Sequence, residues 1–241
     1  MDIFLFVNAL LIVVLCFTLK FTKRYKSYFV LIIIGLMVFL NLSILLIHDQ
    51  LKNFDTWIYE MVTSNMSYHM TIFMKYITNL GSFYALVLIT VIVYILTWNN
   101  NKNAIVYGRV ISINLVTVWL MNNGLKLIFQ RERPDILRLV EESSLSFPSG
   151  HAMVSMCFYG FLAYLILRNS NNKLIRIVSV WMIGFIIVMI GISRIYLGVH
   201  YASDVLAGFA FGWVWMFLMI IAMEQFYKRR IEKYFKKLIK I

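Results

Sequence analysis

Cationic, histidine and carboxylate side chains gather in three short segments of the second half of the chain, at residues 126–134, 148–151 and 193–204. Each segment lies at the end of a long apolar run. Charged groups beside lipid are costly and usually serve a site, so we interpret the three segments as parts of one active site. Together they supply two histidines, one carboxylate and three fixed cations, a set that suits nucleophilic attack on a phosphate.

His200 and Asp204 are four residues apart and come just before an apolar run, so we expect them to share one face of a helix. A carboxylate that accepts a proton from one imidazole nitrogen fixes the tautomer and leaves the other nitrogen free as a nucleophile. The alternative is an interfacial histidine beside an acidic residue that the helix dipole favours.

The segment Pro148-Ser149-Gly150-His151 predicts a turn before a helix that begins near Ala152. Such a turn aims backbone N–H groups and the Ser149 hydroxyl at one point, where a phosphate would be stabilised. His151 is then placed to protonate the leaving oxygen as a general acid. The alternative for Ser149 is a simple helix N-cap.

Lys126, Arg133 and Arg194 are the fixed cations of the set. The planar fork of arginine suits phosphate oxygens, and lysine adds a point charge. Charge builds on those oxygens during transfer, so fixed cations help most in the transition state. Snorkelling to the interface is an alternative that explains Lys126, but it does not explain three cations together with two histidines. Arg131 and Arg138 flank Arg133, and one hypothesis is that they meet a second phosphate.

The order of the three motifs and the spacings inside each of them all occur together in this chain. The combination is therefore a more specific signal than any single motif. The chain resembles the type 2 phosphatidic acid phosphatase (PAP2) superfamily, which also includes vanadium haloperoxidases and bacterial glucose-6-phosphatase-like enzymes. The three-part signature is matched at its defining positions, within residues 126–204, and the resemblance covers roughly residues 54–223.

The resemblance implies a role for each motif residue. It implies that His200 is the nucleophile that forms a phosphohistidine, that Asp204 orients it, and that His151 is the general acid. It also implies that the phosphate is bound by Lys126, Arg133, Arg194, Ser149 and Gly150. Enzymes of this kind use no metal or other cofactor, and the sequence has no cluster of acidic residues or of His and Cys that would hold a metal.

The composition predicts an integral membrane protein, because 61% of the 241 residues are hydrophobic and only 14% are charged. Backbone groups in lipid must pair within their own segment, so we expect an all-α polytopic helix bundle. Seven apolar runs are candidate spans, at residues 3–19, 28–47, 83–98, 104–125, 152–167, 174–192 and 205–223. The resemblance implies a six-helix phosphatase core, which makes the first run an extra N-terminal transmembrane helix. A cleaved signal peptide is the alternative for that run, but it lacks a basic n-region and a small-x-small site.

The net charge of +12 follows the loops between the apolar runs. Most of the 23 lysines and arginines fall on one side when the seven runs alternate, which predicts a cytoplasmic C-terminus and an active site on the extracytoplasmic side. The same three motif segments then share one face of the membrane. With no nucleic-acid-binding motif present, we expect no nucleic-acid partner, and the bilayer and a lipid phosphate are the expected partners.

Two further segments complete the organisation. Residues 48–82 are mixed in character, and within them apolar side chains recur at three- and four-residue steps from Leu51 to Val62, which predicts an amphipathic helix in the outer interface. The tail 224–241 alternates basic and apolar residues and should lie on the inner leaflet. The division is therefore 1–27 for the extra helix and its basic loop, 28–223 for the PAP2-like domain, and 224–241 for a cytoplasmic tail.

The predicted function is hydrolysis of a lipid phosphomonoester or diphosphate at the outer face of a bacterial membrane. Undecaprenyl diphosphate is the first expectation, and phosphatidylglycerophosphate or phosphatidic acid is the alternative. A haloperoxidase that binds vanadate is disfavoured because the resembling haloperoxidases are soluble. A transporter or scaffold with a vestigial site is the remaining alternative, although both histidines are present.

Overall fold

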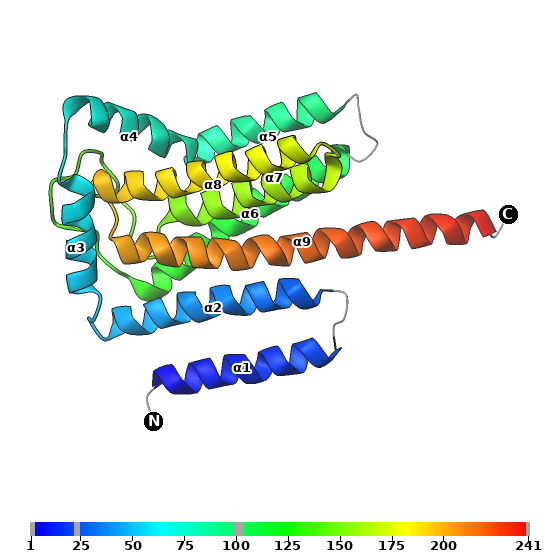
Figure 1. Cartoon of the computed structure of the whole chain (residues 1–241), viewed down its shortest axis with the longest axis horizontal. Coiled ribbons are helices and arrows are strands. Elements are labelled where there is room, and N and C mark those ends of the chain that lie inside the picture. The colour runs from blue at the N-terminus through cyan, green and yellow to red at the C-terminus, as the bar shows by residue number, and fades with distance from the viewer. Residues whose placement is uncertain (1–2, 22–24, 99–103, 240–241) are drawn as a thin grey trace.

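The computed structural model describes the backbone of residues 3–21, 25–98 and 104–239, and the side chains of residues 4–14, 25–95 and 107–226. The described part is all-helical and contains no strand, as the composition predicts (Figure 1). Its helices are α1 (Ile3–Phe21), α2 (Lys26–Ile47), α3 (Lys52–Thr63), α4 (Tyr68–Leu80), α5 (Phe83–Trp98), α6 (Ala104–Phe129), α7 (Gly150–Asn169), α8 (Lys173–Tyr196) and α9 (Ala202–Ile239).

Five helices are long and apolar enough to cross a membrane, namely α2, α6, α7, α8 and α9. Helices α4 and α5 are bent by 56° at the break between them and are apolar and long enough only as a pair, which is the pattern of a broken span or of a re-entrant loop. The run 83–98 is too short to be the separate span that was predicted, because its 16 residues rise only about 24 Å against a hydrocarbon core of about 30 Å. For the predicted first span, the apolar helix with described side chains is Phe4–Val14, and the rest of its side chains lie outside the described residues.

The amphipathic helix predicted from the apolar residues between 51 and 62 is present as α3, and a second helix that was not predicted, α4, follows it within residues 48–82. The chain leaves the helix after Thr63, and Ser67 caps the next one by accepting a hydrogen bond from Met70 N at 3.2 Å. Only α3 lies across the end of the bundle, where Trp57 and Met61 are exposed, while α4 packs along α8 (Figure 1). The amphipathic pattern of the segment thus serves two different surfaces.

Helices α7 and α9 form the most extensive contact of the bundle. Gly208 and Gly212 make it possible, because a Cβ at Gly208 would lie 2.7 Å from Ser149 O and one at Gly212 would meet the backbone of Met153. Small residues four apart let helix backbones approach closely in a membrane. The first turns of α7 and α9 are therefore held together, with Ser149 N donating to Asp204 O at 3.0 Å.

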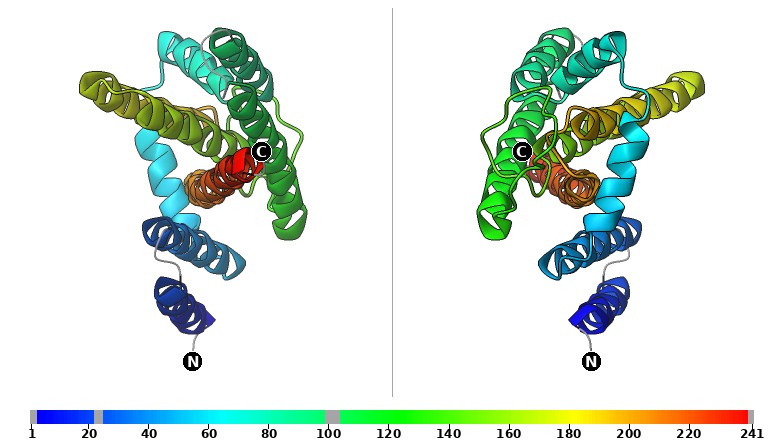
Figure 2. Two further views of the ribbon diagram at one scale, coloured as in Figure 1. Left: turned by 90° about the vertical axis from the view of Figure 1, so that its right-hand side faces the viewer. Right: turned by 90° about the vertical axis from the view of Figure 1, so that its left-hand side faces the viewer.

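Helix α1 lies at the periphery of the bundle and packs on α2 (Figure 2). A reciprocal pair of side-chain amide hydrogen bonds joins them, between Asn8 and Asn41 at 3.0 and 3.1 Å. Polar pairs of this kind stabilise helix contacts where lipid offers no alternative partner. This arrangement agrees with an extra helix added to a separate core.

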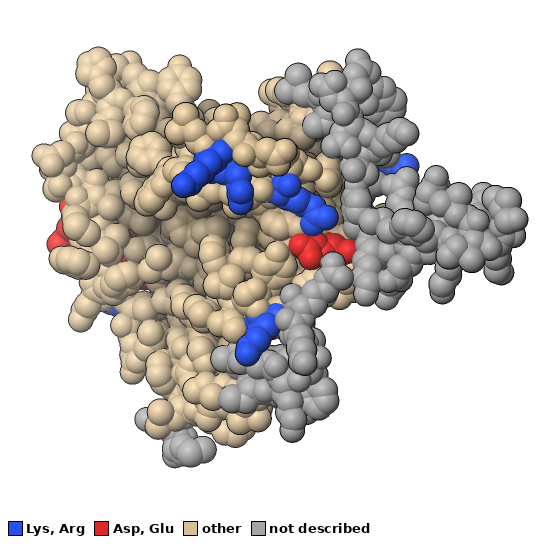
Figure 3. Space-filling view, turned by 45° about the vertical axis from the view of Figure 1, so that its right-hand side comes forward, with Lys and Arg blue, Asp and Glu red and all other residues tan. Residues whose placement is uncertain are grey.

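Lys and Arg side chains gather at the end opposite α3, around an acidic group (Figure 3). Lys26, Arg168, Lys173 and Arg176 are exposed at helix ends there. Glu224 of α9 accepts a hydrogen bond from Tyr164 at 2.7 Å and lies 3.5 Å from Arg168. The tail predicted at 224–241 continues α9 as one helix to Ile239, instead of forming a separate segment. Its side chains from residue 227 onward, and those of the basic residues predicted at 20–24, lie outside the described residues.

Candidate active site

The three predicted segments meet at the α3 end of the bundle, around a cavity of about 270 Å³. Six of the eight predicted site residues line it, namely Lys126, Arg133, Gly150, His151, Arg194 and His200. The other two, Ser149 and Asp204, are fully buried next to them. The cations come from the ends of α6 and α8 and from the connection 130–149, which folds over this end of the bundle. Segments that are far apart in the sequence therefore share one cavity.

His200 and Asp204 are neighbours, although they do not share a helical face as the spacing predicts. His200 lies in the turn between α8 and α9, and α9 begins only at Ala202. Gly198 turns the chain there with φ +70°, a conformation that glycine adopts without strain. The turn brings His200 Nδ1 to 3.5 Å from Asp204 Oδ2.

Ser146 bridges these two side chains and was not predicted from the sequence. Its hydroxyl donates to Asp204 Oδ2 at 2.5 Å and lies 3.3 Å from His200 Nδ1. A hydroxyl carries one proton, so with that proton directed at the carboxylate, Nδ1 must be the donor to Ser146. The imidazole proton is then on Nδ1, and the lone pair is on Nε2.

The lone pair of Nε2 lies on the side of the cavity that Arg133 lines, with Arg133 Nη1 at 3.3 Å. His200 is 2% exposed. Burial, followed by the positive charges of Arg194, Arg133 and Lys126, holds the pKa of His200 well below its usual value. The ring is therefore neutral at physiological pH, which is the form that can act as a nucleophile.

Asp204 is fixed by several donors in addition to Ser146. It accepts the backbone N–H of Tyr201 at 2.9 Å and a hydrogen bond from Arg131 Nη1 at 2.5 Å. Arg131 also pairs with Asp55 at 2.8 Å. Because both terminal nitrogens of Arg131 hold carboxylates, the hypothesis that it meets a second phosphate loses its support.

Lys126 and Arg133 are held by the connection 130–149 and by the turn before α9. Lys126 Nζ donates to Ser144 Oγ at 2.8 Å, and Arg133 Nε donates to Ser144 O at 2.6 Å. Arg133 Nη1 donates to Val199 O at 2.6 Å. Burial lowers the pKa of Arg133 to about 10, so the guanidinium stays charged at neutral pH. Both cations are thus fixed before any ligand binds.

Arg194 is 1% exposed and is oriented from two sides. Its Nη1 donates to Thr78 Oγ1 at 2.9 Å, and its Nη2 donates to Glu142 Oε1 at 2.5 Å. The other oxygen of Glu142 lies 3.7 Å from Arg133 Nη2. The carboxylate of Glu142 therefore lies between two of the three cations.

Two buried side-chain atoms have no hydrogen-bond partner among the described residues, and both belong to the predicted phosphate-binding set. They are Ser149 Oγ and Arg194 Nε. Ser149 occupies the N-cap position of α7, but its side chain makes no capping hydrogen bond. The alternative of a simple N-cap therefore does not account for this hydroxyl. Buried donors are normally paired, so the site holds hydrogen-bonding capacity for a ligand.

Comparison with known proteins decides the family. A family model of the PAP2 superfamily matches residues 106–228, which include every motif described above. The chain belongs to the PAP2 superfamily. It is an integral membrane protein and a PAP2-type lipid phosphatase.

Curated relatives of this PAP2 protein are themselves phosphatases. It is 38% identical over 154 residues to phosphatidylglycerophosphatase B of Bacillus subtilis (strain 168), a match that covers 59% of this chain and 70% of the relative. It is 24% identical over 207 residues to an undecaprenyl-diphosphatase of Sulfolobus acidocaldarius, covering 83% and 93% of the two chains.

Solved structures agree with the fold. The transmembrane PAP2-type phosphatidylglycerolphosphate phosphatase of Bacillus subtilis superposes with a TM-score of 0.71 at 30% identity, covering 81% of this chain and 96% of that one. Aquifex aeolicus LpxE shares the fold with a TM-score of 0.52 at 21% identity, covering 67% and 92% of the two chains.

The Pro148–His151 turn of this PAP2 protein is held by a residue that the sequence analysis missed. Asn122 Nδ2 donates to Pro148 O at 3.2 Å. A Cβ at Gly150 would lie 2.9 Å from Asn122 Oδ1, so glycine permits this close approach. Helix α7 begins at Gly150, two residues before the predicted start, and His151 lies in its first turn. The α4–α5 bend contacts His151, because a Cβ at Gly81 would lie 3.3 Å from the imidazole.

Among the described residues, no group of three or more His, Cys, Asp or Glu side chains could hold a metal ion. The charged groups that line the cavity are instead the three cations and Glu142.

Proposed function

We propose that this PAP2 enzyme removes phosphate from a membrane lipid through a phosphohistidine intermediate on His200. The observation that carries the proposal is the set of three fixed cations around one cavity, with two unpartnered buried donors, Ser149 Oγ and Arg194 Nε, in the same set. A tetrahedral phosphate can use the guanidinium forks, the ammonium and the hydroxyl together. These groups are most favourable when charge builds on the phosphate oxygens.

In the first step, His200 Nε2 attacks phosphorus, the P–N bond forms and the P–O bond to the lipid breaks. His151 donates a proton to the leaving oxygen, so the lipid departs as an alcohol. The proton on Nδ1 stays directed at Ser146, and the negative charge of Asp204 compensates the positive charge that develops on the ring.

In the second step, water attacks phosphorus and the P–N bond breaks. His151, which has given up its proton, now accepts one from the attacking water. Inorganic phosphate is released and His200 returns to its neutral form. The cycle therefore needs no group beyond the side chains of the cavity and one water molecule.

In this scheme, the phosphate replaces the Glu142 carboxylate as the anion paired with Arg194 and Arg133. Glu142 is 2.5 Å from Arg194 and 3.7 Å from Arg133, both of which bind the incoming phosphate in the proposal. A phosphate dianion that takes over these guanidiniums would move the Glu142 carboxylate toward the polar cavity of about 430 Å³ that it also lines.

Lipid reaches the cavity from the side in this proposal. Phe83 of α5 and Trp119 of α6 line the cavity and are both exposed, with ring centroids 6.2 Å apart. In a bilayer, this pair would face acyl chains while the cations face the headgroup. The opening between α5 and α6 is therefore the proposed entry.

Phosphatidylglycerophosphate is the favoured substrate within this class. The relative with 38% identity and the structure with 30% identity are named for it. The neighbouring polar cavity also disfavours a second phosphate, because it is lined by three carboxylates and only two guanidiniums: Glu132, Asp135 and Glu142 against Arg133 and Arg138. A glycerol-bearing headgroup brings less charge to that cavity than the second phosphate of a diphosphate.

Undecaprenyl diphosphate, the first expectation from the sequence, stays as the second candidate. The match to an undecaprenyl-diphosphatase over 83% of this chain supports it. Phosphatidic acid is the third substrate to compare, because it presents the same phosphomonoester without the second glycerol.

The proposed orientation puts the active site on the extracytoplasmic side and the C-terminus in the cytoplasm. The exposed cations Lys26, Arg168, Lys173 and Arg176 at the opposite end support it, since cytoplasmic loops carry an excess of Lys and Arg. The proposed division is residues 1–27 as an added helix, 28–223 as the phosphatase and 224–241 as a cytoplasmic tail.

The test is phosphate release by the purified protein in detergent, with the three lipids compared by kcat/KM. We expect phosphatidylglycerophosphate to be preferred and His200→Ala to lower kcat by at least about 10⁴-fold while the protein stays folded. Wild-type turnover by that variant would contradict the nucleophile assignment. No release from any lipid by folded protein would contradict the proposed function.

Chelation supplies a second arm of this test. Activity should survive excess EDTA, because fixed cations supply the charge at the phosphate in the proposal. Loss of activity with EDTA and recovery with added Mg²⁺ would contradict the metal-free scheme.

A further inference from the structure

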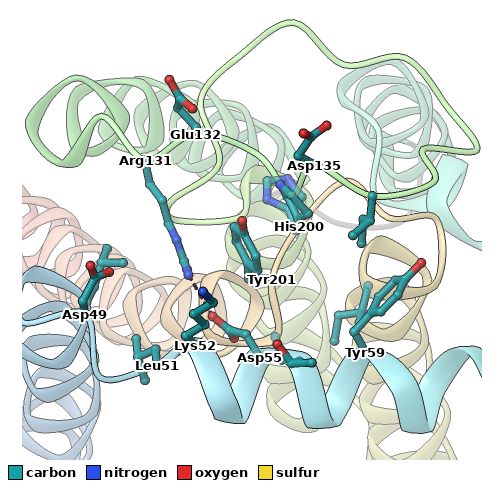
Figure 4. A pocket seen from close by; sticks show the side chains of 16 residues that line it. Asp49, Leu51, Lys52, Asp55, Tyr59, Arg131, Glu132, Asp135, His200 and Tyr201 are labelled. Carbon is teal, nitrogen blue, oxygen red and sulfur yellow. Dashed lines mark hydrogen bonds and ion pairs between the residues drawn. The ribbon is translucent and has the colours of Figure 1, made fainter.

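Asp204 is one end of a chain of ion pairs and hydrogen bonds that begins on α3. Asp55, on the inner side of α3, accepts the backbone N–H and the hydroxyl of Ser203, both at 2.8 Å. It also accepts Arg131 Nη2 at 2.8 Å, and Arg131 Nη1 reaches Asp204 Oδ1 at 2.5 Å. Figure 4 shows Arg131 extending toward Asp55, with Tyr201 beside it.

Arg131 is held in one orientation by more than its charge. Its guanidinium carbon lies 3.9 Å from the centre of the Tyr201 ring, and Nη1 also donates to Ser203 Oγ at 2.8 Å. Both of its carboxylate partners are buried, Asp55 at 3% and Asp204 at 0% exposure. Only a planar fork can hold two carboxylates at set positions in this way.

Arg131 does not share the cavity in which the proposed chemistry takes place. It lines a separate cavity of about 670 Å³ between α3, the connection 130–149 and the start of α9 (Figure 4). His200 lies between the two cavities and lines both. Arg131 therefore acts on the imidazole from behind, through Asp204 and Ser146, and not on the phosphate.

We propose that Arg131, held by Asp55 of α3, is a positioning residue that keeps Asp204 and, through Ser146, His200 in the geometry for attack. The proposal rests on the proposed function, because it assigns His200 as the nucleophile. A buried carboxylate that loses its cationic partner is strongly disfavoured, so Asp204 would leave its position or take up a proton. Either change removes the acceptor that directs the Ser146 hydroxyl, and Nδ1–H loses its orientation.

The test separates positioning from binding by comparing kcat with KM on the lipid that the wild-type enzyme hydrolyses best. Arg131→Met should lower kcat by about 100-fold, the effect expected when a catalytic group is misplaced by about 1 Å, with KM little changed. Arg131→Lys should recover part of kcat, because an ammonium can pair with one of the two carboxylates.

Asp55→Asn tests the far end of the chain. It should lower kcat by about 10-fold, because Arg131 keeps Asp204 but loses its second anchor. The double variant Asp55→Asn/Arg131→Met should be no slower than Arg131→Met alone, since residues that act as one unit are not additive.

Lys52→Met is the matched control. Lys52 is an exposed cation on α3 that lines the same cavity, and its side chain makes no hydrogen bond or ion pair with the described residues. Its removal should leave kcat and KM at wild-type values. A loss of kcat equal to that of Arg131→Met would mean that kcat depends on the total positive charge of this cavity and not on the hydrogen bonds of Arg131, which overturns the positioning role.

Further outcomes discriminate between the two proposals. Wild-type kcat in folded Arg131→Met, a loss confined to KM, or additive effects in the double variant would overturn the positioning role alone. If Arg131→Met does not fold, the changes in kcat and KM of Arg131→Lys and Asp55→Asn decide between positioning and binding. Failure of the wild-type enzyme to release phosphate from any lipid would instead overturn the proposed function.

Discussion

The two ends of the bundle use charged residues in opposite ways. At the α3 end, Asp55, Arg194 and Asp204 are at most 3% exposed, and each has at least two hydrogen-bond partners. At the other end, Arg168 also has partners, Tyr164 at 2.8 Å and Glu224 at 3.5 Å, but the side chains of Arg168 and Glu224 are both partly exposed. The first arrangement encloses charges away from solvent, and the second leaves them exposed to solvent and lipid headgroups.

This contrast separates two uses of charge in a membrane protein. Burying ions is unfavourable unless hydrogen bonds and counter-charges compensate, so a buried network indicates a site that needs fixed geometry. Exposed cations at helix ends affect orientation in the membrane, and that role depends on number more than on position. Substitutions at the two ends should therefore have different consequences.

Among the tests of this contrast between the two ends, the largest effect is expected for Arg194→Lys. Lysine cannot reproduce the fork that joins Thr78, Glu142 and the cavity, so kcat/KM should fall by about 100-fold or more. The measurement is phosphate release in detergent, with Lys173→Arg at the opposite end as control. Near wild-type activity of Arg194→Lys would show that positive charge alone suffices at this position. It would contradict the view that the α3 end needs fixed geometry while the opposite end does not.

A smaller effect concerns the protonation of His200. Burial and the three neighbouring cations hold the pKa of His200 below the usual imidazole value of about 6.5, so the ring should remain neutral when the pH is lowered to that value. An NMR titration of ring-labelled histidine in the free enzyme measures this, with His200→Ala to assign the signal. Half-protonation of His200 at or above this pH would contradict the fixed-charge account of the α3 end.

The smallest effect is expected for Glu224→Gln. The amide oxygen can still accept from Tyr164, and the lost ion pair with Arg168 is partly exposed, so unfolding free energy should fall by no more than about 1 kcal/mol. The kcat should stay at its wild-type value. Thermal unfolding in detergent and phosphate release measure both quantities, and a marked loss of kcat would show that the two ends are coupled.

Much of the site could be predicted because its residues have few other uses in a lipid environment. Charged and polar side chains such as Arg194 and His200 are unfavourable beside lipid. In the sequence they lie between two successive apolar runs, and in the structure both line the same cavity. The all-α fold follows from the same physical constraint, the pairing of backbone groups within each segment. The predictions of the fold class and of the site residues therefore rested on residue types and on the lengths of the apolar runs.

The missed residues are those whose role depends on contacts between distant segments. Ser146 and Asn122 are ordinary polar residues in the sequence, and only the fold puts them against His200 and Pro148. Asp55 lies in a segment with an amphipathic pattern, which indicates a surface helix but not a buried carboxylate at 3% exposure. Helix α4 was missed because the apolar periodicity was followed only as far as Val62, whereas the cap at Ser67 is a local signal that could have revealed a second helix.

The glycine contact between α7 and α9 also has a consequence for motion. Gly208 brings α9 against Ser149 O and Met153 N, so the first turns of the two helices touch through backbone atoms that have no alternative rotamers. This contact opposes any change in the spacing between His151 on one turn and Asp204 on the other. In the proposed cycle, movement that admits a lipid or lets its alcohol depart would therefore fall to α4, α5 and the connection 130–149.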